Sequence, residues 1–248
     1  MTEAMVIYGI RPVQEALHAG KTIDKILIQK GLHGDQIQLL FHACRERDIP
    51  FQFVPVQKLN RISSKNHQGV IAFVSPVSYY QLEQWLPGLY ESGKVPLILI
   101  ADRITDVRNF GALCRTAEAC AVDLVLFPSR GSAALNEDAV KTSAGAMMRV
   151  PLCREPNLKL SMQYLKDSGV RIIGVSEHAQ QLFYQQDYTL PTALLLGSEE
   201  DGISPAYLPY CDALVKLPML GEIASLNVSV AGGVVMYAAV VQRMQAGM

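Results

Sequence analysis

The sequence predicts an α/β protein in two parts: a small mixed unit over residues 1–75 and a larger unit over residues 96–248. Wholly apolar runs alternate with helical stretches after residue 96, which is the pattern of a parallel sheet with helices on both faces. The stretch from 75 to 96 contains three prolines, two glycines and little periodicity, so residues 76–95 are interpreted as a linker. Half of the 248 residues are apolar, which is enough to bury a sizeable core.

The N-terminal part alternates helical and strand patterns. The spacing of its apolar residues predicts helices over residues 12–19 and 37–47. Apolar and β-branched runs predict strands over residues 23–29, 51–56 and 70–74. A compact α/β unit of about 75 residues is large enough to fold as a domain of its own.

The linker contains one short helical pattern, over residues 82–86. Three aromatic residues lie in or beside it, namely Tyr79, Tyr80 and Trp85. Such side chains stack on bases in some nucleic-acid-binding proteins. More often they pack a linker against the surface of a domain, and packing is the favoured interpretation here.

The C-terminal part alternates strands and helices. Apolar runs predict strands over residues 97–101, 124–127, 171–175, 193–196 and 213–217. Helical spacing predicts helices over residues 110–121, 136–144, 158–168 and 228–245. The chain contains no Gly-x-Gly-x-x-Gly and no Gly-x-x-x-x-Gly-Lys, so neither a dinucleotide-binding fold nor P-loop chemistry is supported.

Composition argues against several classes of protein. The chain has no run of about 18 apolar residues, the length of a membrane-spanning helix, and its first residues lack the basic and apolar regions of a signal peptide. The five cysteines are odd in number and none has Cys-x-x-Cys spacing. This indicates reduced thiols in the cytoplasm, with neither a disulfide framework nor a zinc site. The five histidines are scattered, so no metal site is expected.

Charge is distributed unevenly, although the formal net charge is only −1. Residues 1–75 hold nine Lys or Arg against six Asp or Glu, whereas residues 96–248 hold twelve against fifteen. A basic N-terminal part followed by an acidic C-terminal part suggests that the first part grips a polyanion and the second performs the chemistry.

The most informative segment is residues 217–231, which joins the last predicted strand to the last predicted helix. Ser225, Asn227 and Ser229 lie within five residues at this junction. The side-chain oxygens of Ser and Asn accept hydrogen bonds from the free backbone N–H groups at a helix N-terminus. Taken alone, this junction predicts a helix cap.

Two further segments, 109–115 and 197–202, each follow an apolar strand and change this interpretation. Together with residues 218–231, and in this order, they resemble the three motifs of the SpoU (TrmH-type) RNA ribose 2′-O-methyltransferases of the SPOUT superfamily. The matching residues are Asn109, Gly111 and Arg115, then Gly197, Ser198, Glu199 and Gly202, then Pro218, Met219, Ser225 to Ser229 and Ala231. The three motifs span about half of the chain, and no catalytic position is substituted.

The resemblance implies a fold and a reaction that periodicity cannot show. The family's parallel sheet ends in a C-terminal trefoil knot, whose loops bind S-adenosyl-L-methionine in a bent shape. The segments starting at Tyr8 and Asn66 resemble the N-terminal RNA-binding domain of the ribosomal-RNA branch. The implied activity is methyl transfer to the ribose 2′-hydroxyl of a guanosine in 23S rRNA, by a homodimer that completes each site with residues from both chains.

The resemblance assigns catalytic roles to Asn109, Arg115, Glu199, Ser225 and Asn227. Arg115 suits phosphate binding, because a planar guanidinium binds phosphate through two parallel hydrogen bonds. With a pKa above about 12 it is nearly always protonated, so stabilising a developing alkoxide fits it better than acting as a general base. Glu199 is expected to orient Arg115 or the substrate, and Ser225 and Asn227 to cap the last helix and bond the ribose or Asn109.

The cofactor is expected at Gly197, Leu217 and Leu226. Gly197 ends a strand and leaves room for the close approach of backbone. The two leucines can offer backbone groups to the adenine edge and apolar walls to its ring. Without the family resemblance, simple core packing would be the favoured interpretation of both leucines.

Two alternatives to a 23S rRNA enzyme remain open at this point. One is a tRNA ribose 2′-O-methyltransferase, although members of that branch carry short terminal extensions in place of the N-terminal domain. The other is a non-catalytic RNA-binding ribosome-assembly factor with the same fold, which the intact motif residues disfavour. A small-molecule-binding α/β protein is a third reading, made less favourable by the basic N-terminal part.

Overall fold

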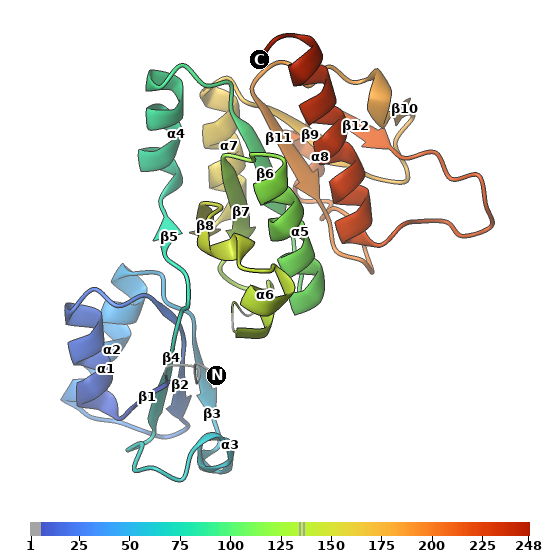
Figure 1. Cartoon of the computed structure of the whole chain (residues 1–248). Coiled ribbons are helices and arrows are strands. Elements are labelled where there is room, and N and C mark those ends of the chain that lie inside the picture. The colour runs from blue at the N-terminus through green and yellow to red at the C-terminus, as the bar shows by residue number, and fades with distance from the viewer. Residues whose placement is uncertain (1–5, 134, 136) are drawn as a thin grey trace. The chain divides into compact units, whose positions relative to one another are not determined.

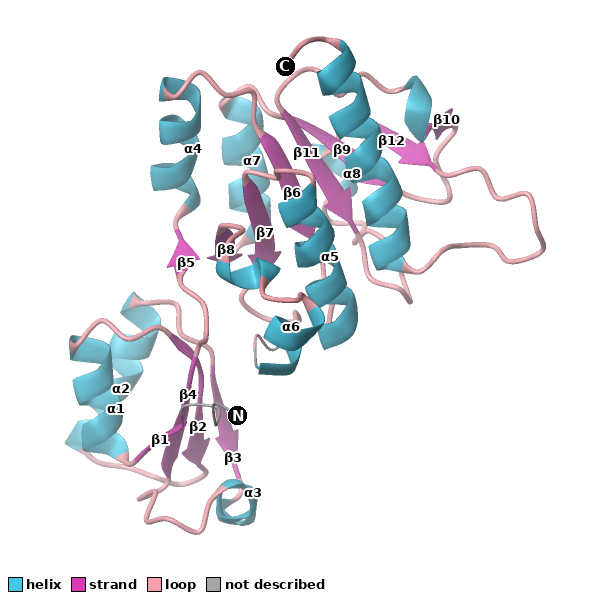
Figure 2. Ribbon diagram, in the orientation of Figure 1, coloured by secondary structure: helices cyan, strands magenta, loops and turns pink. Residues whose placement is uncertain are grey.

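The computed structural model describes residues 6–133, 135 and 137–248, and they divide into two units. The first unit holds the described residues up to Ser78 together with Leu135 and Glu137, and the second holds the rest. Figure 1 shows both units with their elements labelled, and Figure 2 shows the same view coloured by secondary structure.

The first unit is a mixed four-stranded sheet in the order β1-β4-β2-β3. Its strands are β1 (Val6–Tyr8), β2 (Ile23–Gln29), β3 (Phe51–Val54) and β4 (Val70–Val74). Its helices are α1 (Ile10–His18), α2 (Asp35–Glu46) and α3 (Val56–Ile62). β4 runs antiparallel to β1 and β2, whereas β2 and β3 are parallel.

The predicted elements of this unit are present, and β1 and α3 are additions. Strand β3 stops at Val54, two residues before the predicted end, because Pro55 has no backbone N–H to give to the sheet and serves as the N-cap residue of α3. Strand β1 has only three residues, too few to show an alternating pattern. Helix α3 has seven residues and buries only Leu59, so its pattern was equally weak.

The second unit is built on an eight-stranded sheet in the order β10-β12-β9-β11-β6-β7-β8-β5, in which every recorded strand pair is parallel. Its strands are β5 (Tyr79–Tyr80), β6 (Leu97–Ala101), β7 (Leu124–Pro128), β8 (Leu152–Glu155), β9 (Arg171–Val175), β10 (Gln181–Leu182), β11 (Thr192–Leu196) and β12 (Ala213–Lys216). Its α-helices are α4 (Leu82–Glu91), α5 (Val107–Ala119), α6 (Glu137–Thr142), α7 (Leu158–Asp167) and α8 (Val228–Gln245).

Helices cover both faces of this sheet, as predicted (Figure 2). On one face, α4 and α7 pack against alternate residues of β6, β7, β9 and β11 in a single apolar core. On the other face lie α5 and α8, which pack against each other, and α8 also contacts β11.

The predicted strands are all present, while β5, β8 and β10 were not predicted. Residue 136, where one helix was predicted to start, lies outside the described residues; α6 is observed over Glu137–Thr142.

The segment interpreted as a linker is structured from Tyr79 onward. Helix α4 is longer than the predicted helix and buries Leu82, Leu86 and Leu89 in the core of the second unit. The Trp85 indole donates to the backbone oxygen of Asp123 at 3.0 Å. The Tyr79 ring lies edge-on to Phe127, with ring centroids 6.1 Å apart. These two aromatic residues therefore pack against the sheet, as the sequence favoured.

Helix α8 is anchored at its C-terminal end by Arg243. The guanidinium is half-buried and donates to the backbone oxygens of Tyr188, Val95 and Pro96, at 3.0, 2.7 and 3.0 Å. These bonds fix the end of α8 to loops at the amino ends of β6 and β11. They hold in place the helix whose other end opens onto the site described below.

No helix within the described residues combines the length and the hydropathy that a membrane crossing requires. All five cysteines are free thiols. Within the same residues, no three His, Cys, Asp or Glu side chains are grouped in a way that could hold a metal ion.

Candidate active site

The parallel sheet brings distant parts of the chain to one edge. The segments that leave the carboxyl ends of β6, β9, β11 and β12 meet there, because parallel neighbours all point the same way. Two cavities lie at this edge. The large cleft has a volume of about 480 Å³ and is lined by residues that follow β9, β11 and β12 and by the first turn of α8. The small cavity, of about 290 Å³, is lined by residues that follow β6 and β11 and by Gly131, which follows β7.

The segment 198–203 folds back over Gly197 and forms a wall shared by both cavities. A Cβ atom on Gly197 would lie 2.0 Å from the backbone carbon of Gly202 and 2.1 Å from the nitrogen of Ile203. Ser198 and Gly202 exchange two backbone hydrogen bonds, each of 3.0 Å, and Gly202 has a φ of 66°. Glycine is therefore required at 197 for close approach and favoured at 202 for its left-handed backbone.

Asn227 joins all three motif segments through hydrogen bonds. Its amide nitrogen donates to Asn109 Oδ1 at 3.0 Å and to Glu199 Oε1 at 2.7 Å. Its amide oxygen accepts from the backbone N–H of Ser229 at 2.9 Å, which makes Asn227 the N-cap residue of α8. One side chain thus caps the helix and ties the loop after β11 to the start of α5.

Three other predicted site residues line the large cleft, namely Leu217, Ser225 and Leu226. The sequence also allowed Ser225 a capping role, and this was wrong: α8 begins at Val228, so Ser225 lies two residues before the cap residue. The side chain of Leu226 is 41 % exposed, which places it on the cleft surface and outside the core.

Arg115 is not brought to the site within one chain. It is exposed on α5 and lines neither cavity. Asn109, at the start of the same helix, lines the small cavity. Six helical residues separate the two side chains by about 9 Å along the axis and by about 120° around it, given a rise of about 1.5 Å and about 3.6 residues per turn. The side chains of Asn109 and Arg115 on one α5 helix therefore cannot point to the same site.

The buried Asp102 and the partly exposed Arg103 form an ion pair that sequence reasoning missed. The Asp102 side chain is fully buried and accepts from the backbone N–H of Ser204 at 2.8 Å and from Arg103 Nε at 3.2 Å. Arg103 also donates to Asp201 at 3.1 Å and to the Gly202 oxygen at 3.0 Å. These bonds pin the segment 198–203 to the end of β6. The available signal was a charged pair directly after an apolar strand.

The surroundings of Arg103 keep its guanidinium positively charged. Burial lowers the pKa of Arg103, but hydrogen bonds and charge from Asp102 and Asp201 outweigh burial and raise the pKa above its ordinary value. The backbone of Arg103 has a φ of 55°, in the left-handed region that disfavours residues other than glycine. The charge network holds this unusual backbone in place.

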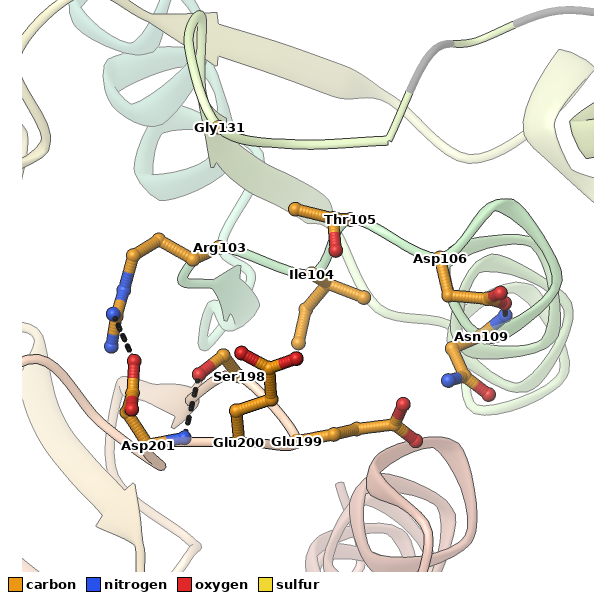
Figure 3. A pocket seen from close by; sticks show the side chains of 10 residues that line it. All are labelled: Arg103, Ile104, Thr105, Asp106, Asn109, Gly131, Ser198, Glu199, Glu200 and Asp201. Carbon is orange, nitrogen blue, oxygen red and sulfur yellow. Dashed lines mark hydrogen bonds and ion pairs between the residues drawn. The ribbon is translucent and has the colours of Figure 1, made fainter.

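Acidic side chains line the small cavity (Figure 3). Glu199 points toward Asn109 from one wall, and Glu200 points toward Ile104 across the cavity. No hydrogen-bond partner for the Glu200 carboxylate is found among the described residues. Asp201, in contrast, is neutralised by Arg103.

The chain matches two family models, one for each unit. Residues 96–237 match the SpoU rRNA Methylase family, which is more than half of the chain. The chain belongs to this SpoU family. Residues 6–80 match the family described as RNA 2′-O ribose methyltransferase substrate binding. The expected family is thus confirmed, and the protein is an RNA methyltransferase.

Related proteins agree over nearly the whole length. A protein of Staphylococcus saprophyticus, described as a TrmH family tRNA/rRNA methyltransferase, is 35% identical over 95% of this chain and 94% of its own. The SpoU methyltransferase AviRb from Streptomyces viridochromogenes, solved with AdoMet, shares the fold with a TM-score of 0.63, 24% identity and coverage of 97% and 91%. The TrmH/SpoU tRNA modifying enzyme of A. aeolicus has a TM-score of 0.57 and 31% identity over 67% of this chain and 86% of that one.

The cofactor of this SpoU protein is S-adenosylmethionine, and the large cleft fits it. The cleft volume of about 480 Å³ lies within the range of pockets for drug-sized ligands. Leu217 and Leu226 give apolar lining, and Gly197 and Ser198 belong to the same lining. When bound, the cofactor supplies an electrophilic methyl group on a positively charged sulfur.

Proposed function

We propose that this SpoU protein methylates the ribose 2′-hydroxyl of a nucleotide in ribosomal RNA, with a guanosine of 23S rRNA as the favoured target. The observation that carries the proposal is the hydrogen bonding of Asn227. It links Asn109 and Glu199, from two other motifs, at the mouth of the large cleft. A residue that only caps a helix would not need hydrogen bonds to Asn109, more than a hundred positions earlier in the chain, or to Glu199, on another loop.

The residues of the chain divide the work between orientation and charge. Asn227 and Glu199 orient one another, so that polar oxygens face the boundary between the two cavities. The N-terminus of α5, capped by Asp106, lines the small cavity and favours negative charge there. We assign acceptor positioning to Asn109, Glu199, Ser225 and Asn227, and cofactor binding to Gly197, Leu217 and Leu226.

Arg115 takes part through a second copy of the chain in this proposal. Helix α8 carries a stripe of exposed apolar residues on one face: Val230, Val234, Tyr237, Val241 and Met244. Their spacing of three and four residues is that of a helix packing seam. Pairing of two chains through this face, beside α5, would bring Arg115 of one chain toward the cavities of the other. Arg115 then binds a substrate phosphate and stabilises the developing alkoxide.

We also propose that the segment after β12 forms the trefoil knot of the SPOUT fold. The supporting observation is the path of the chain. β12 lies beyond β9 from β11, yet the chain then returns to α8, which packs on β11 and α5. Tracing the backbone in an experimental structure tests this topology.

Five free thiols support a reducing compartment such as the cytoplasm.

Two substrates compete, and one experiment separates them. The N-terminal unit favours ribosomal RNA, whereas the match to a tRNA modifying enzyme over 67% of the chain keeps tRNA as the second candidate. Purified protein is incubated with radiolabelled S-adenosylmethionine and either 23S rRNA, ribosomal particles or a tRNA pool. Label in rRNA that maps to a ribose 2′-oxygen supports the proposal. Label in tRNA alone, or on a base, rejects it.

A further inference from the structure

Among the described residues of the first unit, α1 and α2 cover one face of the sheet, and only the short helix α3 packs on the other. The first face forms a core of eleven buried residues with both helices. The second face forms a core of only four, namely Leu27, Val54, Leu59 and Ile71. Among the helices of this unit, the seven-residue α3 is the one that packs there. A sheet face this lightly covered exposes side chains that a partner can contact.

Two aromatic rings and two lysines lie on this second face. Phe73 of β4 pairs across the sheet with Val6 of β1 and Lys25 of β2, so these residues share a face. Tyr8 lies two residues beyond Val6 on the same strand and shares it too. Tyr8 and Phe73 are half-buried. Rings in a closed core would be fully buried.

Both rings are partly exposed, and an ammonium group lies over each. Lys25 Nζ lies 5.1 Å from the centroid of the Phe73 ring, and Lys65 Nζ lies 5.3 Å from that of Tyr8. A charged ammonium keeps its hydration shell unless paired. The lysine chains are flexible, so they can leave the ring faces to another planar group and turn their charges outward.

Charge is segregated around this face. From Ile49 to Ser78 the chain contains no Asp or Glu, and its cations are Lys58, Arg61 and Lys65, all exposed. The acidic residues of the helices lie on α1 and α2, which cover the opposite face: Glu15, Asp35 and Glu46. Asp24 is the extra residue of the bulge before Lys25, and it is the one acidic residue in the strands of this sheet. The second face is therefore cationic and aromatic.

We propose that this face binds unpaired nucleotides of the RNA substrate. Bases stack on Tyr8 and Phe73, while Lys25, Lys65 and the cations of α3 contact phosphates. Single strands suit such a surface because their bases are free to stack on aromatic rings, whereas bases in a duplex stack on one another. The inference rests on the proposed function for its choice of RNA, and it adds which face recognises the RNA and in which form.

The test measures RNA binding by the full chain without S-adenosylmethionine. Fluorescence anisotropy is recorded for a single strand of about 12 nucleotides, a site size typical of stacking surfaces, and for the same sequence as a duplex. The variants are Tyr8→Leu/Phe73→Leu, which keeps apolar packing, and Lys25→Gln/Lys65→Gln. The matched control is Lys21→Gln/Arg45→Gln, which removes the same charge near α1 and on α2.

We expect the leucine pair to weaken single-strand binding about tenfold or more, equivalent to about 1.4 kcal/mol, with little change for the duplex. We expect the glutamine pair to reduce the slope of log affinity against log salt by about 1.4, at about 0.7 per phosphate contact on a single strand. The control should leave that slope near the wild-type value. Crosslinks from 4-thiouridine RNA should map to peptides containing Tyr8 or Phe73.

Three results would overturn the inference: wild-type affinity in the leucine pair, equal losses for single strand and duplex, or a slope change as large in the control as in the glutamine pair. If the leucine pair does not fold, the variant of the partly exposed Lys25 and the exposed Lys65 still decides the matter through its slope against the control. Methylation is read separately. Wild-type protein that binds single strands through this face but labels no RNA refutes the proposed function and leaves the face intact.

Discussion

Replacement of Asn227 separates its two structural tasks. Asn227→Ala removes both the cap of α8 and the bridge from Asn227 to Glu199 and Asn109. Asn227→Asp keeps an oxygen for the N–H of Ser229 but replaces the donor that faces Glu199 with a second acceptor. Cap and bridge therefore fail together in the first variant, and the bridge fails alone in the second.

The magnitudes follow from the distances. Loss of an N-cap costs about 0.5–2 kcal/mol, so Asn227→Ala should unfold at a melting temperature lower by a few degrees. In Asn227→Asp, two carboxylates would face each other at the 2.7 Å now spanned by the hydrogen bond to Glu199. Their repulsion is about 1.5 kcal/mol at the dielectric constant of water, and salt will screen it because the site is exposed.

Both variants should lose cofactor affinity and methyl transfer, measured by isothermal titration and by label incorporation. The repulsion in Asn227→Asp raises a carboxyl pKa in the folded state, so its stability deficit is present at pH 7. The deficit should disappear as the pH falls through that raised pKa toward about 4, the unfolded value. Melting curves at pH 4 to 7 check the sign.

A matched control is the cap of α7. Asn157 accepts from the backbone N–H of Lys159 at 3.1 Å and makes no bond to the site. Asn157→Ala should lower the melting temperature to a similar degree while cofactor affinity and activity stay at wild-type values. Wild-type turnover in Asn227→Asp would refute the bridge, and equal activity loss in Asn157→Ala would show that any weakened cap is sufficient to impair the enzyme.

Four further outcomes are expected. Arg115→Ala should abolish methyl transfer while S-adenosylmethionine still binds, and Arg115→Lys should rescue little because a point charge cannot replace a planar fork; wild-type turnover would remove its catalytic role. Arg103→Met should lower the unfolding free energy by about 1–2 kcal/mol and weaken cofactor binding, seen in denaturant curves and titration. Gly232→Val should cost about 1–3 kcal/mol, because its Cβ lies 2.5 Å from Leu196 Cδ1. Val234→Arg should convert a dimer to a monomer in sedimentation equilibrium, and a wild type that is already monomeric when active would reject the pairing.

Strand periodicity determined most of the fold. Five mainly apolar runs in the second unit predicted five parallel strands, and three of them, β6, β9 and β11, lie next to one another at the centre of the sheet. Central strands are buried on both faces, so nearly every residue in them is apolar and can be recognised in the sequence. The edge strands β5 and β10 have two residues each and carry almost none, so they could be found only from their pairing partners.

The sequence by itself determined the chemistry available at the site and the order of its motifs, because Asn109, Glu199 and Asn227 keep the residue types and spacing of the SpoU family. Only the tertiary structure decided which of them meet. Hydrogen bonds between residues 118 and 28 positions apart depend on where parallel strands end, and no local pattern encodes that. The charges of Asp102 and Arg103 were visible in the sequence, but the burial of Asp102 and the bonds of this pair to residues 201–204 could be seen only in the fold. Arg115 shows the opposite case: its residue type was evident, but the geometry of a single helix turns it away from Asn109.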